Sequence, residues 1–362
     1  MTKKILGAAV IGTSFGVLTH VRALRRAGIE VLALVGRDPG RTAERAQREK
    51  IPSAFTDLQA ALKLPGVDIV SIATPPHTHA AITLAAAAAG KHIMCEKPFA
   101  ANLAEAQSML EAAERARVVH VIGTEFRFAT GQALATRAIR AGVIGTPKLA
   151  TFTLMHPGLA HPDSGVPQWW SHEESGGGWF GAYASHVIDQ MRHTLGDWSG
   201  LSASLSQIAE RAWTADDSYT LHFKTVAGCV GVLQSTAASW GPFASQSRIT
   251  GSRGTLTILG DNVLVADARG ERQLDVPQDL VNPAPLPPNT DLLVTAYDML
   301  HAGGIDIGPY TKLFEAMKRM ILGDASSPLD PAPATFRDGV TLQRIMDAAR
   351  RSSAVGSWEK LA

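Results

Sequence analysis

Cysteine and long apolar runs are scarce in this sequence of 362 residues. The two cysteines, Cys95 and Cys229, are too few for a disulfide framework, and no apolar run reaches the roughly 20 residues that span a membrane. The net charge of +1 gives no electrostatic attraction to nucleic acid or to an anionic membrane surface. Residues 1–4 lack the apolar core of a signal peptide, so we expect a cytoplasmic protein with neither nucleic acid nor a membrane as partner.

With 45% hydrophobic and 19% charged residues, the amino-acid composition is typical of a globular protein. A chain of this length exceeds one ordinary hydrophobic core, which predicts two domains. Up to Gly123, apolar strand patterns alternate with helical patterns, and this alternation predicts a doubly wound parallel sheet. The expected strands cover residues 4–11, 29–35, 68–73, 92–95 and 118–122, and the expected helices end near residues 27, 89 and 117.

The second half contains strand patterns that follow one another without intervening helices, which favours antiparallel pairing. These strands cover residues 148–155, 201–208, 218–224, 229–235, 247–250 and 255–259. Helices are expected over residues 131–141, up to residue 195, and over residues 307–322 and 336–351, with a proline-rich excursion over residues 275–291.

A Glu-Lys-Pro sequence, Glu96-Lys97-Pro98, follows the short apolar strand 92–95. Ligands of open parallel sheets bind at the carboxyl ends of the strands, so we expect Glu96 and Lys97 at the ligand crevice. An ordinary solvated turn would account for the pair equally well if it stood alone.

A glycine turn, Gly12-Thr13-Ser14-Phe15-Gly16, lies between the first strand and a helix, the context of a dinucleotide-binding loop. The helix N-terminus would present N–H groups to a pyrophosphate. The motif G-x-G-x-x-G is incomplete, because Ser14 and Val17 stand where it has glycines.

The second strand ends in Gly36-Arg37-Asp38 rather than in the carboxylate that binds an NAD ribose. Arg37 would suit a 2′-phosphate, which favours NADP over NAD, while Asp38 keeps NAD possible. After the third strand, at residues 74–79, two histidines flank Thr78, but a metal site is not expected without cysteines or carboxylates nearby.

The glycine loop, Ala73-Thr74-Pro75 with His79, and Glu96-Lys97-Pro98 together resemble the glucose–fructose oxidoreductase, inositol dehydrogenase and rhizopine catabolism (Gfo/Idh/MocA) family. The resemblance covers essentially the whole chain. It implies an α/β protein with an N-terminal Rossmann domain, residues 1–124, and a C-terminal α+β domain, residues 125–362. The second domain would carry a large, mostly antiparallel open sheet, through which the chain would form a homodimer or homotetramer.

A glycine-rich stretch, residues 176–181, precedes a helix on which Ala182, His186, Asp189 and His193 share one face. The family motif places its acid-base histidine at His186, and its aspartate partner at position 182 is replaced by Ala182. A histidine satisfied within the core would be the simpler explanation of His186 alone. Tyr183, Asp189 or the substrate would have to orient the ring instead.

The resemblance implies an NAD(P)-dependent oxidoreductase for a carbinol or carbonyl of a sugar, polyol or similar small ring compound. The expected site residues are Lys97 and His186 for catalysis, Gly12, Thr13, Ser14, Phe15, Gly16, Arg37, Thr74, Pro75, His79, Glu96 and Lys97 for the cofactor, and Arg127, Trp170, Tyr183 and Asp189 for the substrate. Two alternatives stay open: a glycoside-cleaving enzyme that oxidises transiently with bound NAD, and a non-catalytic dinucleotide-binding regulator.

Overall fold

The computed structural model describes residues 4–284, 301 and 304–361. Contacts divide the chain into two compact units, the first formed by residues 1–125 and 283–341 and the second by residues 126–282 and 342–362. The expected boundary near residue 124 therefore coincides with the end of the first unit's N-terminal segment. Residues 283–341, however, return to that unit instead of continuing the second.

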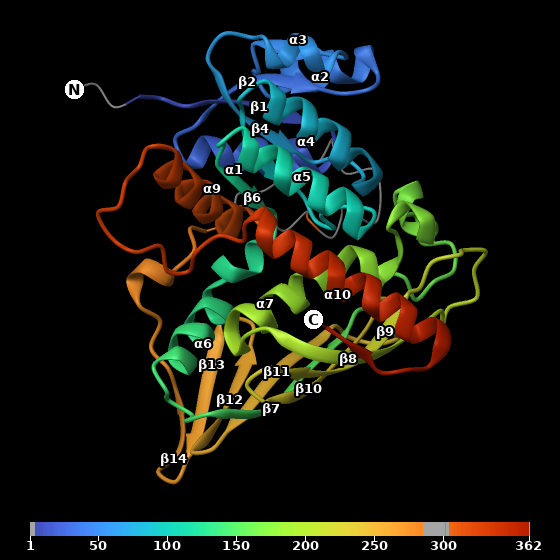
Figure 1. Ribbon diagram of the computed structural model, residues 1–362, viewed down its shortest axis with the longest axis vertical. Coiled ribbons are helices and arrows are strands. Elements are labelled where there is room, and N and C mark those ends of the chain that lie inside the picture. The colour runs from blue at the N-terminus through green and yellow to red at the C-terminus, as the bar shows by residue number, and fades with distance from the viewer. Residues whose placement is uncertain (1–3, 285–300, 302–303, 362) are drawn as a thin grey trace. The chain divides into compact units, whose positions relative to one another are not determined.

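The first unit contains the parallel sheet that the sequence predicts, with six strands in the order β3-β2-β1-β4-β5-β6 (Figure 1). This is the strand order of a Rossmann fold. The strands are β1 (Gly7–Ile11), β2 (Glu30–Val35), β3 (Ser53–Phe55), β4 (Val67–Ile72), β5 (His92–Cys95) and β6 (His120–Ile122). The helices are α1 (Val21–Arg26), α2 (Pro39–Arg48), α3 (Leu58–Leu62), α4 (His79–Ala88), α5 (Leu103–Arg115) and α9 (Ile307–Ile321), and α10 (Phe336–Val355) begins here.

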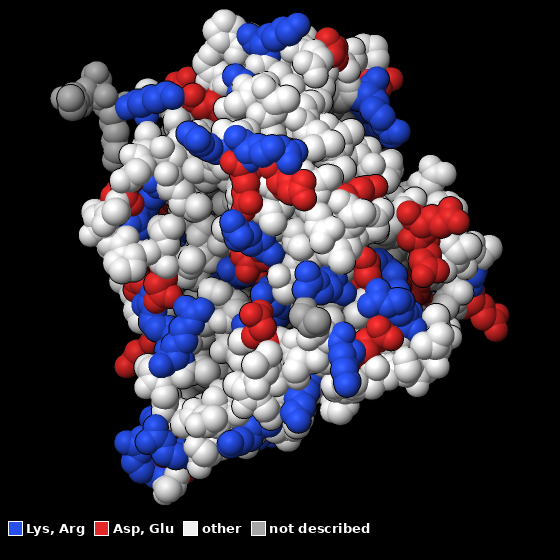
Figure 2. All heavy atoms as spheres, viewed as in Figure 1, with Lys and Arg blue, Asp and Glu red and all other residues white. Residues whose placement is uncertain are grey.

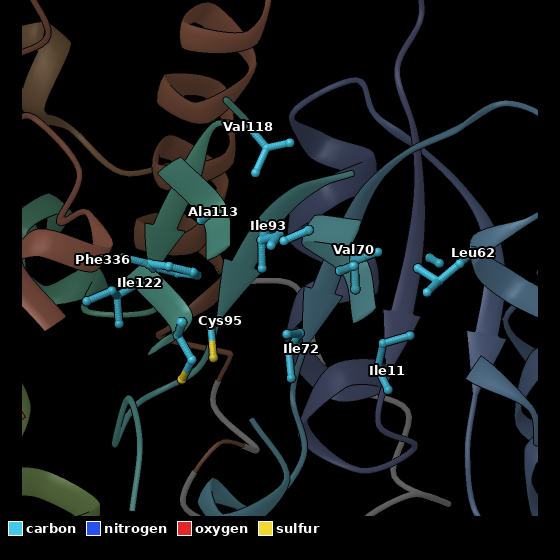
Figure 3. Packing of buried hydrophobic residues seen from close by; sticks show 14 of the residues in the cluster. Ile11, Leu62, Val70, Ile72, Ile93, Cys95, Ala113, Val118, Ile122 and Phe336 are labelled. Carbon is cyan, nitrogen blue, oxygen red and sulfur yellow. The ribbon is translucent and has the colours of Figure 1, made fainter. Parts of the chain in front are cut away.

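Alternate residues of the parallel strands point to opposite faces of this sheet. Ile11, Ile72 and Ile93 point to the face that α3, α4 and α5 cover, and Phe336 completes the buried cluster there (Figure 3). On the opposite face Val10 lies against the helical turn that opens α1, and α1 contacts α9.

The expected first strand began too early, because residues 4–6 are not part of β1. The cause is Asp68, whose carboxylate accepts hydrogen bonds from the Gly7 N–H (3.1 Å) and from Lys4 Nζ (2.8 Å). A comparable side-chain capture ends β8 before Ile208, where the Asp217 carboxylate accepts from the Ile208 and Ala209 N–H groups (2.9 and 3.0 Å).

The second unit is built on a nine-stranded sheet in the order β14-β13-β12-β11-β7-β10-β9-β8-β15. Its described pairs are antiparallel except β7 with β10, which run parallel. The strands are β7 (Pro147–Met155), β8 (Trp198–Ser206), β9 (Ser218–Thr225), β10 (Val230–Thr236), β11 (Ala244–Gly251), β12 (Gly254–Leu259), β13 (Asn262–Asp267), β14 (Gly270–Gln273) and β15 (Glu359–Lys360).

The helices of the second unit include α6 (Thr130–Arg140) and α7 (Ser185–Leu195), which contact one another, and the remainder of α10. The 3-10 segments are η3 (Glu125–Phe128), η4 (Gln168–Ser171), η5 (Glu173–Ser175) and η7 (Gln278–Leu280). The proline-rich excursion is irregular around η7, and its part beyond residue 284 lies outside the described residues. On the surface shown in Figure 2, acidic and basic side chains lie interspersed.

Candidate active site

The glycine loop after β1 is shaped by close backbone contacts. Gly12 has a positive φ of 124°, and a Cβ at this position would lie 2.2 Å from the Ala73 carbonyl oxygen. A Cβ at Gly16 would lie 2.9 Å from Val10 Cγ1. The missing side chains therefore let the loop lie directly over the carboxyl ends of β1 and β4, which suits a bound pyrophosphate.

The helix after this loop does not start as an α-helix. A π-helical turn, η1 (Gly16–His20), precedes α1, and the buried His20 is its last residue. The sequence did not predict this turn, and π-helical turns occur frequently at functional sites.

The carboxyl end of β2 is followed by Gly36, Arg37 and Asp38. A Cβ at Gly36 would lie 2.3 Å from Thr42 Oγ1 and 2.5 Å from Thr13 Cγ2, so packing leaves no room for a side chain there. Asp38 caps α2 and accepts from the Arg41 N–H (2.6 Å). Arg37 is exposed next to this cap.

Glu96 is buried at the carboxyl end of β5, where its carboxylate receives several donors. His20 Nε2 lies 3.1 Å from Oε1, the Tyr310 hydroxyl donates to the same oxygen, and the Lys97 N–H donates to Oε2 (3.2 Å). Burial acts to raise the pKa of Glu96, but the His20 hydrogen bond, nearby positive charge and the Tyr310 hydrogen bond outweigh it and lower the pKa. The Glu96 side chain is thereby held as a carboxylate beside Lys97.

Glu125 is a second buried carboxyl group, which the sequence did not single out as a site residue. It follows β6, next to the carboxyl end of β5 in the sheet. Burial and the charge of Asp306 raise its pKa well above the usual value, while the charge of Lys97 opposes them. Two neighbouring acids, Glu96 and Glu125, are therefore shifted in opposite directions, a pattern that separates charged from neutral carboxyl groups in active sites.

His79 fixes the loop that follows β4. Its Nε2 lies 2.8 Å from the Thr74 carbonyl oxygen, its Nδ1 lies 3.2 Å from the Phe99 carbonyl oxygen, and burial lowers its pKa. The Thr78 hydroxyl donates to the Pro75 carbonyl (2.8 Å) in the same loop. His79 therefore positions Thr74 and Pro75, and direct contact of these three residues with a cofactor stays a prediction.

In the second unit, Arg127 and Asp189 bind one another. Arg127 Nε lies 2.6 Å from Asp189 Oδ2, Nη2 lies 2.5 Å from Oδ1, and both side chains are buried. This bidentate pair satisfies much of the hydrogen-bonding capacity of two residues that the sequence assigned to the substrate. It holds α7 against the segment that precedes α6.

His186 lies on α7 within a cluster of aromatic rings. Its ring stacks on Phe126 with centroids 4.3 Å apart, and Tyr183 lies edge-on at 6.1 Å. Tyr183 in turn stacks on Trp179 at 4.7 Å, and Trp170 lies 6.0 Å from Trp179. Tyr183 is half-buried and lies between His186 and Trp179, while Trp170 and Trp179 are buried. Contact of these rings with a substrate stays a prediction.

Ala182 lies in a second π-helical turn, η6 (Phe180–Ala184), which leads into α7. The sequence predicted a regular helix here. The π-helical turn places position 182 in a different local geometry from that of an α-helix, so the facing of positions 182 and 186 stays a prediction.

Asp216, from the segment before β9, caps the start of this helix. Its Oδ1 accepts from the Phe180 N–H (2.7 Å), and its carbonyl accepts from the Trp179 N–H (3.0 Å). Burial raises the pKa of Asp216 to about 7, although the Phe180 hydrogen bond and the charge of Arg350 act to lower it.

This raised pKa predicts a pH-dependent stability. The folded chain holds the Asp216 proton more tightly than the unfolded chain, so stability falls as the pH rises from about 4 to about 7. Asp216→Asn keeps an acceptor for the Phe180 N–H and cannot ionise. We expect the variant to gain stability relative to the parent between pH 5 and pH 8, by up to a few kcal/mol. Urea unfolding at both pH values measures the difference, and a constant difference would contradict the assignment.

Comparison with known proteins identifies the chain. The model described as an oxidoreductase family with an NAD-binding Rossmann fold matches residues 6–124, and the GFO/IDH/MocA C-terminal domain model matches residues 133–257. Levoglucosan dehydrogenase of Pseudarthrobacter phenanthrenivorans is 30% identical over 89% of this chain and 87% of its own length. The chain belongs to the Gfo/Idh/MocA oxidoreductase family. The sequence-based expectations of family, fold class and NAD(P)-dependent oxidoreductase activity are thereby confirmed.

Further dehydrogenases are similar to this chain in sequence or in structure. D-apiose dehydrogenase of Paraburkholderia graminis is 30% identical over 72% of this chain and 69% of its own length. The structure of levoglucosan dehydrogenase in complex with NADH and levoglucosan has a TM-score of 0.81 at 26% identity and covers 99% of both chains.

Two further properties concern the described part of this Gfo/Idh/MocA protein. No helix within it is long and apolar enough to cross a membrane. Within residues 4–284, 301 and 304–361, no group of three or more histidine, cysteine, aspartate or glutamate residues is arranged to hold a metal ion.

Sequence reasoning missed three of the groups described above: His20, Glu125 and Tyr310. His20 carried a signal, because it lies on the helix that follows the glycine loop. Tyr310 carried none, because it is 214 residues from its partner Glu96.

Proposed function

We propose that this oxidoreductase transfers a hydride between NADP and a carbinol or carbonyl carbon of a sugar, polyol or similar small ring compound. The observation that carries the proposal is Lys97, which follows the buried Glu96 carboxylate at the carboxyl end of β5 in a Rossmann sheet. The related enzymes are named for levoglucosan, D-apiose and myo-inositol, which are polyhydroxylated compounds.

Each proposed catalytic group has a distinct role. The nicotinamide ring, when bound, supplies the hydride acceptor or donor. Lys97 hydrogen-bonds the reacting oxygen and stabilises the negative charge that develops there. His186 takes the hydroxyl proton during oxidation and returns it during reduction.

The other candidate residues are proposed to bind the cofactor or the substrate. Gly12, Thr13, Ser14, Phe15 and Gly16 would hold the pyrophosphate, and Glu96, Thr74, Pro75 and His79 would form or support the nicotinamide half. Tyr183 and Trp170 would contact the substrate ring, and the Arg127–Asp189 pair would fix the wall of the substrate site.

A substrate screen tests the proposed function. Sugars, polyols and cyclic ketones are incubated with NADP(H) or NAD(H), and net formation or loss of the reduced cofactor is followed. We expect net turnover with at least one cyclic polyol or sugar. Dinucleotide binding without turnover on any compound would favour a regulator, and glycoside cleavage without net reduced cofactor would favour the transient-oxidation alternative.

Cofactor preference is the first property to test by mutation. Because Gly36 has no side chain and Asp38 is occupied as a helix cap, Arg37 is the charged group proposed for the 2′-phosphate. We expect Arg37→Ala to weaken NADP binding by about tenfold or more, the scale of one charged hydrogen bond, and to leave NAD binding nearly unchanged. Arg48→Ala is the matched control, since Arg48 lies on α2 and pairs with Glu44 (2.7 Å). Calorimetry that finds equal or tighter NAD binding by the parent would contradict the NADP preference.

Assembly is the second property, and we propose a homodimer or homotetramer formed through the nine-stranded sheet. One face of its central strands is buried, while the opposite face exposes Leu149 (48%) and Val232 (37%) among polar residues such as Thr153 and Gln234. An antiparallel sheet with one such free face is suited to pairing with a second subunit. Light scattering at micromolar concentration should give a dimer or tetramer mass, and a monomer would contradict this.

The proposed location is the cytoplasm. Cys95 and Cys229 are both free and buried, and burial raises the pKa of each thiol, so neither is poised to form a disulfide. Cell fractionation with a tagged chain checks the location.

A further inference from the structure

Helix α9 contacts η1 and α1, the helical segments that follow the glycine loop. Lys318 Nζ donates to the Ala27 and Gly28 carbonyl oxygens (2.9 and 3.0 Å) at the end of α1. Earlier on α9, the Tyr310 ring lies 5.1 Å from the His20 ring, with Phe314 5.9 Å from His20. Helix α9 therefore contacts the rest of the first unit at two places, the end of α1 and the buried His20 ring.

Hydrogen bonds link the Glu96 carboxylate to Tyr310 and, through His20, to Ser71. The Tyr310 hydroxyl and His20 Nε2 both meet Glu96 Oε1, and the Tyr310 oxygen also lies 3.3 Å from the Gly123 carbonyl. His20 Nδ1 lies 2.9 Å from Ser71 Oγ. A neutral imidazole that accepts from Ser71 at Nδ1 carries its proton on Nε2 and can donate it to Glu96.

Space around the carboxylate is equally restricted. A Cβ at position 123 would lie 2.2 Å from Glu96 Oε1, so glycine is required there. Burial, followed by the charges of Glu125 and Glu96, raises the pKa of Tyr310 well above its usual value, which keeps its hydroxyl proton available for donation. The Glu96 carboxylate is thus confined by His20 of η1, Tyr310 of α9 and Gly123, which follows β6.

We propose that His20 and Tyr310 are positioning residues for the reaction, which act through Glu96 to hold the Lys97 ammonium in its working place. The proposal rests on the proposed role of Lys97. The Glu96 carboxylate accepts a hydrogen bond from the Lys97 backbone N–H and attracts the positive charge of the Lys97 ammonium group. The position of the carboxylate therefore affects both the backbone and the side chain of Lys97. Neither His20 nor Tyr310 needs to touch the substrate for this.

The central test compares three variants across pH. Tyr310→Phe removes only the hydroxyl, Glu96→Gln removes the charge, and Lys318→Ala disturbs α9 docking without touching the Glu96 contacts. For each, kcat and KM are measured from about pH 5 to about pH 9, with thermal unfolding as a check of the fold.

We expect Tyr310→Phe to lower kcat by about tenfold and to change KM by less than about threefold, the scale of one lost hydrogen bond to a charged group. The acid limb of its profile should move up by about one pH unit, because Glu96 loses a donor to its charged form. Glu96→Gln should lose the acid limb that belongs to this carboxylate. Lys318→Ala should keep the parent profile even if it unfolds at a lower temperature.

An infrared titration gives a readout independent of turnover. The protonated-carboxyl signal that disappears in Glu96→Gln should titrate about one pH unit higher in Tyr310→Phe than in the parent. An unmoved infrared titration, or an unmoved pH profile in an active Tyr310→Phe enzyme, overturns the inference. If the parent turns over no compound of the substrate panel, the proposed function is contradicted. The infrared titration would still decide whether the Tyr310 hydrogen bond lowers the pKa of Glu96.

Discussion

Replacing Lys97 with alanine should lower kcat by about 10²-fold or more, because one preorganised electrostatic donor to a developing oxyanion has an effect of that size. Lys97 follows β5 and lies next to a carboxylate that is held charged by its neighbours. Cofactor affinity should change much less, since the glycine loop and not Lys97 is proposed to hold the pyrophosphate. Steady-state kinetics on the best substrate of the screen, with cofactor binding measured by fluorescence, separates the two effects.

The same strand offers a matched control. Lys91 precedes β5 and donates to the Val67 carbonyl oxygen (2.8 Å), so it lies at the amino end of the strand that Lys97 follows. We expect Lys91→Ala to keep kcat within about threefold, with some loss of stability. Near-normal turnover by Lys97→Ala, or an equal loss in Lys91→Ala, would refute the electrostatic role of Lys97.

Removing His186 should have the second large effect, a loss of roughly 10² to 10⁴ in kcat/KM, the range of general acid–base catalysis. His186 lies on α7 and stacks on Phe126, so alanine would remove both the proton acceptor and that ring contact. His193 is the matched control, because it lies on the same helix about two turns later and its ring contacts Arg140 (3.1 Å). Full activity of His186→Ala would exclude this histidine as the base.

The alanine at position 182 allows a test of geometry as well as chemistry. A carboxylate near an imidazole favours the charged ring, so Ala182→Asp should raise the pKa of His186. The acid limb of kcat/KM for alcohol oxidation should then move to higher pH, since His186 must be neutral to accept the proton. If His186→Ala is inactive and Ala182→Asp leaves the profile unmoved, the π-helical turn Phe180–Ala184 has turned the two positions apart.

Local signals in the sequence made one strand and several helix ends predictable. The strand His92–Cys95 was predicted with its correct bounds, and helix ends were marked by Gly28, Gly90 and Gly196, whose φ values are 68°, 67° and 91°. Asn102 caps α5, and its side chain accepts from the Glu105 N–H three residues later (3.0 Å). Each of these features depends on a few neighbouring residues.

Features set by distant contacts could not be predicted in this way. Consecutive strand patterns favoured antiparallel pairing, yet β10 runs parallel to β7 because β8 and β9 are placed beyond it in the sheet order. Asp216 binds the N–H of Phe180, which lies 36 residues earlier in the chain, and Arg127 pairs with Asp189, 62 residues later. Such pairs leave no periodic or local signal in a single sequence.

The central claim is net hydride transfer between a carbinol carbon and the nicotinamide. The most direct measurement uses a substrate deuterated at that carbon and follows deuterium by mass spectrometry together with net cofactor reduction. The account predicts that deuterium appears on the nicotinamide in step with ketone product and that the reduced cofactor accumulates. Return of the deuterium to a cleaved sugar without accumulation of reduced cofactor, or binding with no transfer at all, would contradict it.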